Sequence, residues 1–374
     1  MVRRRVVSRF RVIAIAIARW IAILAAAAWT ASSTAGCGGA VGVDWNASGQ
    51  PIVYGADDRR DYFQVSDPAA RALMTESVVA LVSRRWAASL PAGLASAPTA
   101  GTTHHLCPQE PFADQPAAAF CTGVLVDSDL VLTAGHCARL VPVDDVGVVF
   151  DYLYAAPVTL GSGANEIAGI AEIVDEALDD PGAKPRLDFA WLRLTSPVDP
   201  SRRPARISAA APVLNQGEPV LSIAADEGTP LKLAAGGTVR DPRATTADYF
   251  VADTDTSHGA SGGGAFGKDL TLVGILARGL PDLMQRTDGC WTTTEAAEGD
   301  GGEQFTYAAR ALQALCAQKP NGRAICQAEG AGCATGGARP VSGWAWLLCA
   351  LLLARRGRPG GRPSVLEAGT RAAG

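Results

Sequence analysis

One stretch of the sequence decides the fold: Leu132-Thr133-Ala134-Gly135-His136-Cys137, which closes an apolar run at residues 124–132. Cys121 stands sixteen residues before Cys137. The two cysteines flank an expected pair of strands, and a disulfide between them would pin the loop that carries His136 to the neighbouring strand. A single histidine beside a cysteine is more often structural than catalytic, so the meaning of this stretch depends on the motifs that accompany it.

A serine between glycines forms the second motif, Gly259-Ala260-Ser261-Gly262-Gly263. Flanking glycines let the backbone turn tightly, which exposes the hydroxyl and leaves nearby N–H groups free to bind an oxyanion. The same pattern fits the Gly-x-Ser-x-Gly elbow of α/β-hydrolases, in which the base histidine follows the serine. All four histidines precede Ser261 (His104, His105, His136 and His258). The esterase or lipase interpretation is therefore excluded.

An acid at the head of an apolar strand forms the third motif, Asp188-Phe189-Ala190-Trp191-Leu192-Arg193-Leu194. Such an acid is normally a cap or a surface residue. Beside a histidine such an acid can take part in catalysis, because a carboxylate can orient an imidazole and stabilise its charged form. The order His136, Asp188, Ser261, with separations of 52 and 73 residues, completes a set of residues that is typical of nucleophilic catalysis by serine.

The three motifs, together with Cys121-Thr122-Gly123, resemble those of the chymotrypsin/trypsin clan of serine proteases. The resemblance implies an all-β fold of two six-stranded antiparallel β-barrels with a C-terminal helix. It also implies hydrolysis of proteins or peptides, with Ser261 as nucleophile, His136 as base and Asp188 as the residue that orients the base. The backbone N–H groups of Gly259 and Ser261 would form the oxyanion hole, and no cofactor or metal is implied. The alternative is a catalytically inactive binding module of the same fold at the cell surface, although an intact triad argues against it.

A narrower branch of the clan is indicated by residues 51–59, which resemble the mature start of bacterial glutamyl-endopeptidase-like proteases, and by residues 255–261. The resemblance covers residues 50–317, which we expect to be the protease domain. Ala260 departs from animal trypsins, which have at this position an aspartate that pairs with the new N-terminal amine after activation. Without that carboxylate, activity should not require a free amine at Ile52.

Substrate preference depends on the expected pocket, for which the candidates are Asp255, Thr256, Leu276, Arg278 and Gly279. Asp255, six residues before Ser261, stands where trypsins keep the carboxylate that selects Arg and Lys. Residues 274–279 resemble the clan's pocket-wall strand, and Leu276 stands where Glu-selective enzymes have a histidine. A preference for basic residues and a preference of another kind both remain open, whereas glutamate specificity is disfavoured.

The first 36 residues have the pattern of a secretory signal peptide. Five arginines form a basic start (Arg3, Arg4, Arg5, Arg9 and Arg11), residues 13–29 are apolar apart from Arg19, and small residues follow. Arg19 leaves an apolar stretch too short to span a bilayer, which disfavours a transmembrane anchor. Cleavage after Ala35 would leave residues 37–49 as a linker or short pro-segment. Lipidation of Cys37 is the alternative, because residues 34–37 resemble a lipoprotein box.

The C-terminal end carries a second targeting pattern. Gly332-Cys333 is followed by a stretch of small residues, an apolar run at residues 344–354 and the cluster Arg355-Arg356. This arrangement resembles the MYXO-CTERM sorting signals of secreted bacterial proteins, which implies processing by a sorting peptidase near Cys333 and attachment to the membrane at the cell surface. Residues 318–333 would be the tether and residues 334–374 the sorting segment, with a plain tail anchor as the alternative.

If the chain is exported, its cysteines are expected to form disulfides, because disulfides form in oxidising compartments. Six of the nine cysteines lie outside the two processed ends. The expected bridges are Cys121–Cys137, Cys316–Cys326 and, by elimination, Cys107–Cys290. A zinc site is disfavoured, since the chain has no CxxC pair and only four histidines.

The charge of the 374-residue chain is unevenly distributed. Arginines gather at the two ends, which leaves residues 37–333 with 21 basic and 36 acidic side chains, a net charge of −15. A body this acidic is repelled by phosphate backbones, so nucleic-acid binding is disfavoured. With 48% hydrophobic and only 19% charged residues, the chain is not a disordered protein. We expect it to be a monomer.

Short runs rich in Val, Ile, Leu and aromatic residues predict strands, and clusters of Gly, Pro, Asp and Ser separate them. The expected strands lie at residues 120–126, 130–133, 147–152, 169–174, 189–194, 220–224, 249–252 and 270–277. Helical spacing is limited to part of residues 68–86 and to residues 306–317, where Ala308, Leu312 and Leu315 share one face. Residues 92–103 and 295–303 are expected to be loops or insertions.

Overall fold

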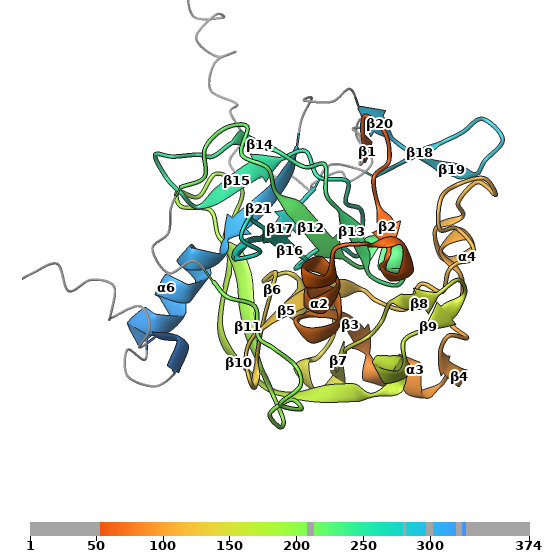
Figure 1. Cartoon of the computed structure of the whole chain (residues 1–374), viewed down its shortest axis with the longest axis horizontal. Helices are drawn as coiled ribbons and strands as arrows, with labels where there is room; N and C mark the ends of the chain where they lie inside the picture. The colour runs from red at the N-terminus through yellow and green to blue at the C-terminus, as the bar shows by residue number, and fades with distance from the viewer. Residues whose placement is uncertain (1–52, 208–212, 280–281, 297–301, 319–323, 327–374) are drawn as a thin grey trace, which may run out of the picture. The chain divides into compact units, whose positions relative to one another are not determined.

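Strands predominate in the computed structural model, which describes residues 53–207, 213–279, 282–296, 302–318 and 324–326 (Figure 1). They form one closed barrel, one large sheet and three two-stranded sheets. The expected signal peptide, the linker, most of the tether and the sorting segment lie outside the described residues, and so do Cys37 and Cys333. Among the described residues, no helix is long and apolar enough to cross a membrane.

Six antiparallel strands close into a barrel in the order β10-β11-β6-β5-β3-β7. Their bounds are β3 Val78–Ser83, β5 Cys121–Asp127, β6 Leu130–Thr133, β7 Val146–Val149, β10 Ile167–Leu178 and β11 Asp188–Leu194. Leu81, Val131 and Leu192 lie in the barrel core. Alternate residues of the same strands pack outward, so that nearly every residue of β3, β5 and β6 is buried and a continuous apolar run replaces the usual alternation. This barrel confirms one of the two six-stranded barrels expected from the sequence.

The second sheet has eight strands in the order β14-β15-β21-β17-β16-β12-β13-β2. Their bounds are β2 Arg60–Asp61, β12 Leu221–Ala224, β13 Lys232–Ala234, β14 Val239–Asp241, β15 Tyr249–Ala252, β16 Gly264–Phe266, β17 Leu272–Arg278 and β21 Glu303–Tyr307. Phe250 of β15 stacks on Phe305 of β21, with the ring centroids 5.2 Å apart. Over the described residues this sheet does not close into a six-stranded barrel, so the second barrel stays a prediction.

The remaining elements are short. The strands are β1 Val53–Tyr54, β4 Pro91–Leu94, β8 Tyr154–Ala156, β9 Thr159–Leu160, β18 Leu283–Gln285, β19 Trp291–Thr293 and β20 Glu295–Ala296. The α-helices are α2 Pro68–Glu76, α3 Arg84–Ala88, α4 Ala100–His104, α5 Cys137–Leu140 and α6 Ala308–Gln318. The 3-10 helices are η1 Tyr62–Gln64, η2 Val143–Asp145, η3 Ser162–Asn165 and η4 Asp226–Gly228.

The end of the second sheet is tied to the barrel at the strand that begins with Asp188. Trp191 of β11 is fully buried, and its indole N–H donates to the carbonyl of Ala311 in α6 at 3.1 Å. The Thr306 hydroxyl of β21 donates to the carbonyl of Asp188 at 3.0 Å. These two bonds fix the start of β11 from the side of the second sheet, and they therefore fix the position of Asp188.

Two segments differ from the expectations drawn from the sequence. Residues 68–86 are helical in part, as expected, but the strand β3 separates α2 from α3. The Asp67 side chain caps α2 by accepting from the Ala69 N–H, but the apolar residues that follow have no helical spacing and are buried as a strand. Residues 92–103, expected as a loop, contain the end of β4 and most of α4, where the Thr99 side chain caps the helix by accepting from the Thr102 N–H.

Candidate active site

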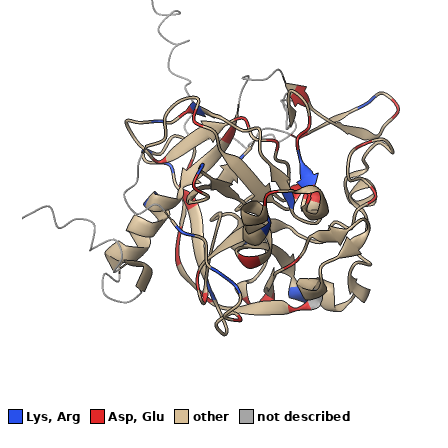
Figure 2. Cartoon of the chain, viewed as in Figure 1, with Lys and Arg blue, Asp and Glu red and all other residues tan. Residues whose placement is uncertain are grey.

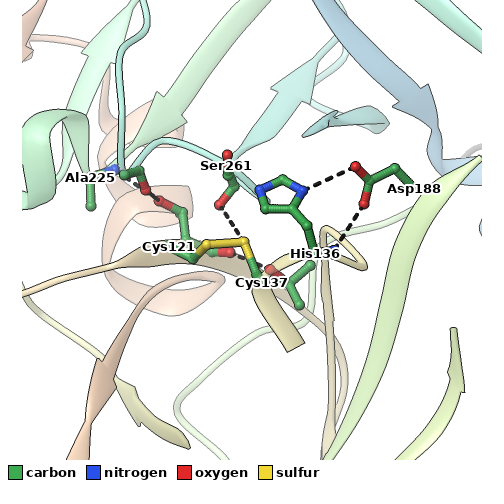
Figure 3. The surroundings of a disulfide bond; sticks show 9 residues. Cys121, His136, Cys137, Asp188, Ala225 and Ser261 are labelled. Atoms are coloured by element: carbon green, nitrogen blue, oxygen red, sulfur yellow. Dashed lines mark hydrogen bonds and ion pairs between the residues drawn. A yellow bond between two sulfur atoms is a disulfide. The ribbon is translucent and has the colours of Figure 1, made fainter. Parts of the chain in front are cut away.

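His136 lies at the junction between β6 and the short helix α5. Gly135 precedes it, and a Cβ at that position would lie 2.2 Å from the carbonyl oxygen of Ala177 and 2.9 Å from that of Phe189. Only glycine fits so close to two backbone oxygens. The disulfide between Cys121 of β5 and Cys137 of α5 holds the other side of His136 (Figure 3). The loop that carries the imidazole is therefore fixed from both sides.

Asp188 orients the His136 imidazole. Its Oδ2 lies 3.0 Å from His136 Nδ1, and its Oδ1 accepts from the His136 backbone N–H at 3.1 Å (Figure 3). The Asp188 side chain is almost completely buried at 3% exposure, whereas that of His136 is 32% exposed. A carboxylate at Nδ1 keeps the proton of a neutral imidazole on that nitrogen, which leaves Nε2 as the acceptor. The pair thus has the arrangement that a general base requires.

Ser261 comes to the same place from the second sheet. Its carbonyl accepts from the Thr122 N–H of β5 at 2.8 Å and lies 3.6 Å from Cys137 Sγ. The backbone of Ser261 is therefore held against the disulfide that flanks His136, as Figure 3 shows. Among the described contacts, the Ser261 hydroxyl has no hydrogen bond to the imidazole. Such bonds are often loose without substrate and tighten when it binds.

The loop around Ser261 presents two backbone donors. Gly259 has φ +93°, and a Cβ there would lie 2.7 Å from both the Ala225 carbonyl oxygen and the Gly228 nitrogen. The Ala260 N–H donates to Ser257 O at 2.9 Å. Within the described part of the chain, the N–H groups of Gly259 and Ser261 donate to no acceptor. These are the two donors that the sequence predicts for an oxyanion hole, and they lie on either side of a turn that glycine makes possible.

The Asp255 carboxylate is engaged by the N-terminal segment. Its Oδ1 accepts from the Tyr54 N–H at 2.8 Å and its Oδ2 from the Asp58 N–H at 2.9 Å. Burial raises the pKa of Asp255 to about 7, although these two hydrogen bonds oppose the rise. A carboxylate engaged by two backbone N–H groups anchors the N-terminal segment, so selection of basic substrates through Asp255 has no support in its contacts. The sequence could not reveal this use because the partners lie about 200 residues away.

The other pocket candidates have different surroundings. The Leu276 carbonyl accepts from the Gly262 N–H at 2.7 Å, but its side chain is buried in the core of the second sheet. Thr256 is buried as well. A Cβ at Gly279 would lie 2.2 Å from Glu303 Oε2. Glu303 is a buried acid beside a candidate wall residue, and sequence reasoning missed it because no motif surrounds it.

Arg278 lies against Asp188 rather than in an open position. Its Nη1 is 3.8 Å from Asp188 Oδ2, and its Nε donates to the Gln304 side chain at 2.9 Å. Burial lowers the pKa of Arg278, and the nearby charge of Arg186 lowers it further. A guanidinium near Asp188 competes with His136 for the same carboxylate, which the sequence did not predict.

His258 lies three residues before Ser261. Its ring is 6.0 Å from that of His104, centroid to centroid, and His104 Nε2 lies 3.0 Å from the Glu227 carbonyl oxygen. His258 is exposed, but partial loss of hydration at its ring lowers its pKa, and the neighbouring imidazoles of His104 and His136 lower it further. The neutral form of the His258 imidazole is therefore favoured beside the Ser261 loop.

The three expected disulfides are confirmed: Cys107–Cys290, Cys121–Cys137 and Cys316–Cys326. Two groups of side chains in the described residues have the spacing of metal ligands: Cys121, His136 and Cys137, and Cys107, Asp288 and Cys290. In both, the sulfur atoms are joined in a disulfide. Metal binding by cysteine requires thiolates, so neither group fits a metal ion.

Comparison with known proteins agrees with this geometry. Residues 121–275 match the family model of the trypsin-like peptidase domain. The matched segment contains His136, Asp188 and Ser261, and it supports the resemblance to the chymotrypsin/trypsin clan and to serine-type peptidases. It does not reach the residues 51–59 on which the glutamyl-endopeptidase-like branch rests, so that branch stays a prediction.

No curated protein matches the sequence. Among solved structures, the VesB protease of Vibrio cholerae is 17% identical, with a TM-score of 0.43, and the match covers 71% of this chain and 67% of that one. Kallikrein-related peptidase 10 is 18% identical, with a TM-score of 0.37, and the match covers 54% of this chain and 90% of that one.

Proposed function

We propose that the protein is a serine endopeptidase that hydrolyses peptide bonds through an acyl-enzyme. The contact that carries the proposal is the one between Asp188 Oδ2 and His136 Nδ1, at 3.0 Å, next to the Ser261 loop and inside the segment that matches the trypsin-like peptidase domain. A buried carboxylate, a half-exposed imidazole and a serine between glycines have no common structural purpose, whereas together they supply nucleophile, base and orienting group.

In this mechanism His136 Nε2 takes the proton from Ser261 Oγ as the oxygen attacks the scissile carbonyl carbon. The negative charge that develops on the carbonyl oxygen is bound by the N–H groups of Gly259 and Ser261. His136 returns the proton to the leaving amine, the C–N bond breaks, and the acyl group remains on Ser261. Water then attacks the ester, with His136 again as base, and releases the acid and the free serine.

Several finer features belong to the same proposal. Proteins or peptides are the substrates, and the large sheet provides the wall of the second expected barrel. The residue preference is left unassigned, because the Asp255 carboxylate is engaged by Tyr54 and Asp58. Assignment to the glutamyl-endopeptidase-like branch rests on residues 51–59 and 255–261.

We also propose export through residues 1–36 and anchoring at the cell surface through processing near Cys333, on the sequence patterns of the two ends. Deletion of residues 334–374 should then release active protease into the medium. Mass spectrometry of the mature surface protein checks this: a C-terminus near Cys333 agrees with sorting, and an intact Arg355-Arg356 tail contradicts it.

Replacement of the nucleophile or the base tests the function. Ser261→Ala and His136→Ala should each reduce the kcat of peptide hydrolysis by about 10⁴- to 10⁶-fold, while the fold survives because both side chains border solvent. Ser128→Ala, at an exposed turn, is the control and should keep full activity. Near-normal hydrolysis by folded Ser261→Ala would show that Ser261 is not the nucleophile. A wild-type protein that cleaves no member of a peptide library would favour the inactive binding module.

A further inference from the structure

The nucleophile loop has no charged residue directly before Ser261. Ala260, the residue before Ser261, is apolar and completely buried. The loop is braced instead by η4: the Ser257 N–H donates to Asp226 Oδ1 at 2.7 Å, and the Glu227 N–H donates to Ser257 Oγ at 3.0 Å. Because Gly259 also lies directly against the backbone of this turn, any movement of η4 would move one of the two oxyanion donors.

η4 places two acids in the interior. The residues Asp226 and Glu227 are 2% and 3% exposed. Burial raises the pKa of Asp226 to about 7, and Arg59 acts against the rise. Two neighbouring carboxylates in the interior repel each other and lose hydration, so the turn needs a cation to keep this conformation.

Arg59 supplies that cation. Its side chain is 1% exposed, its Nη1 lies 3.5 Å from Glu227 Oε1, and its Nη2 and Nε donate to Asp57 at 2.8 and 3.0 Å. Burial alone would lower the pKa of Arg59, but Glu227, Asp57 and Asp226 together hold it above its ordinary value. The guanidinium is therefore charged under all conditions in which the protein folds, which distinguishes it from an amine that must first be released by cleavage.

Residues 53–61, which we call the N-terminal strap, hold Arg59 in place. Asp255, in the loop that leads to Ser261, accepts from the Tyr54 and Asp58 N–H groups. Asp58 in turn accepts from the N–H groups of Ala235 and Gly236. At the end of the strap β2 pairs with β13, and the buried Lys232 Nζ lies 3.0 Å from Asp61 Oδ1. Figure 2 shows basic and acidic residues close together at this end of the strap.

We propose that Arg59 is a positioning residue for the nucleophile loop: through Glu227 and Asp226 it fixes Ser257 and Gly259, and so it sets the oxyanion donors without a free N-terminal amine. The inference rests on the proposed function for its catalytic consequence. Its structural part, the ordering of residues 255–263 by a buried cation on the strap, stands on the contacts alone.

The test compares the full chain with Arg59→Met, Arg59→Lys and Arg60→Met. Arg60 is the adjacent residue and is exposed, so its replacement is a matched control. Each variant is measured well below its own thermal midpoint in two ways: by amide hydrogen exchange of residues 255–263, and by the rate constant for inactivation by a fluorophosphonate together with kcat and KM for a peptide. The exchange measurement needs no activity, so it remains informative if the proposed function fails.

For Arg59→Met we expect faster exchange in residues 255–263 and a fall in kcat and in the inactivation rate of about 10- to 100-fold, with a smaller change in KM. Arg59→Lys should recover part of both losses, and Arg60→Met should match the wild type. A folded Arg59→Met with wild-type exchange, or with faster exchange but unchanged kcat and inactivation rate, overturns the proposal. A wild type that does not react with the fluorophosphonate overturns the proposed function instead.

Should Arg59→Met fail to fold, Glu227→Gln provides the same test. The substitution keeps the size of the side chain and removes the charge that Arg59 Nη1 faces. Faster exchange in residues 255–263 and a lower inactivation rate support the proposal. Wild-type values of both in folded Glu227→Gln overturn it.

Discussion

At the scale of single residues, Asp188 contacts two basic side chains rather than one. Its Oδ2 lies 3.0 Å from His136 Nδ1 and 3.8 Å from Arg278 Nη1. The sequence predicts the first contact, because the motif at residues 188–194 and the histidine motif at residues 132–137 can each be recognised from neighbouring residues alone. These motifs cannot predict the second, since Arg278 reaches Asp188 only when β17 and β11 are brought together by the fold.

Arg278→Met should therefore change the pH dependence of activity. A cation near Asp188 weakens the stabilisation that the carboxylate gives to a charged imidazole. Its removal should shift the acid limb of the kcat/KM profile to higher pH by about 0.5 to 1 unit. Arg193→Met is the control, because Arg193 lies on β11, the strand of Asp188, but pairs with Glu172 at 2.6 Å. An unchanged limb, or a shift to lower pH, would contradict this reading of the contact.

At the scale of secondary-structure elements, the sequence predicts β6 and β15 with the bounds found in the structure, because turn residues border each short apolar run. β3 was not predicted, since a strand buried on both faces lacks alternation and its run adjoins a helix. The N-terminal strap and η4 were missed for another reason. Their conformation depends on contacts between distant charged residues, which leave no local pattern.

The turn before β15 offers a pH-dependent test at this scale. Asp248 is fully buried, and its carboxylate accepts from the Arg186 N–H at 2.9 Å and from Arg243 Nε at 3.0 Å. Burial would raise the pKa of Asp248, but hydrogen bonds from Arg243 and Thr246 outweigh it and hold the pKa well below its ordinary value. The charged carboxylate therefore stabilises the fold above the pKa of the unfolded chain, and this contribution is lost as pH falls toward the folded value.

Asp248→Asn should lower the free energy of unfolding at pH 7 by about 1 to 3 kcal/mol. The difference in the free energy of unfolding between Asp248→Asn and the wild type should shrink as the pH falls below about 4. At that pH the Asp248 carboxyl of the unfolded wild type becomes protonated. Urea unfolding at pH 7 and at low pH measures both values. A difference that stays constant over this range would show that the charge of Asp248 does not stabilise the turn.

At the scale of the whole molecule, three disulfides join pairs of segments in the described part of the chain. Cys107–Cys290 links residues 183 apart, next to α4 and β19, whereas Cys121–Cys137 closes a short loop at the active site. Their pairing could be predicted because sequence spacing favours Cys121–Cys137 and Cys316–Cys326, which leaves Cys107 and Cys290 by elimination. The path of the second sheet could not, because eight short strands are ordered by contacts that are distant in sequence.

Removal of the Cys121–Cys137 bridge should affect stability and activity separately. The chain-entropy model gives a loop of this length about 3 kcal/mol of stabilisation. The double variant Cys121→Ser/Cys137→Ser should lose that amount, and its activity should fall at temperatures below global unfolding because the His136 loop loosens. Cys316→Ser/Cys326→Ser, at the end of α6, should lose stability without this early loss of activity. Equal behaviour of the two variants would contradict the role assigned to the active-site bridge.

Covalent labelling shows directly whether Ser261 is a nucleophile activated by His136. The full chain is treated with a fluorophosphonate, digested and examined by tandem mass spectrometry. We expect one adduct, on Ser261, that is absent in Ser261→Ala and forms several orders of magnitude more slowly in His136→Ala. The absence of an adduct on Ser261 in the folded wild-type protein would show that Ser261 is not a reactive nucleophile. Equally fast labelling of Ser261 in His136→Ala would show that the imidazole does not activate it.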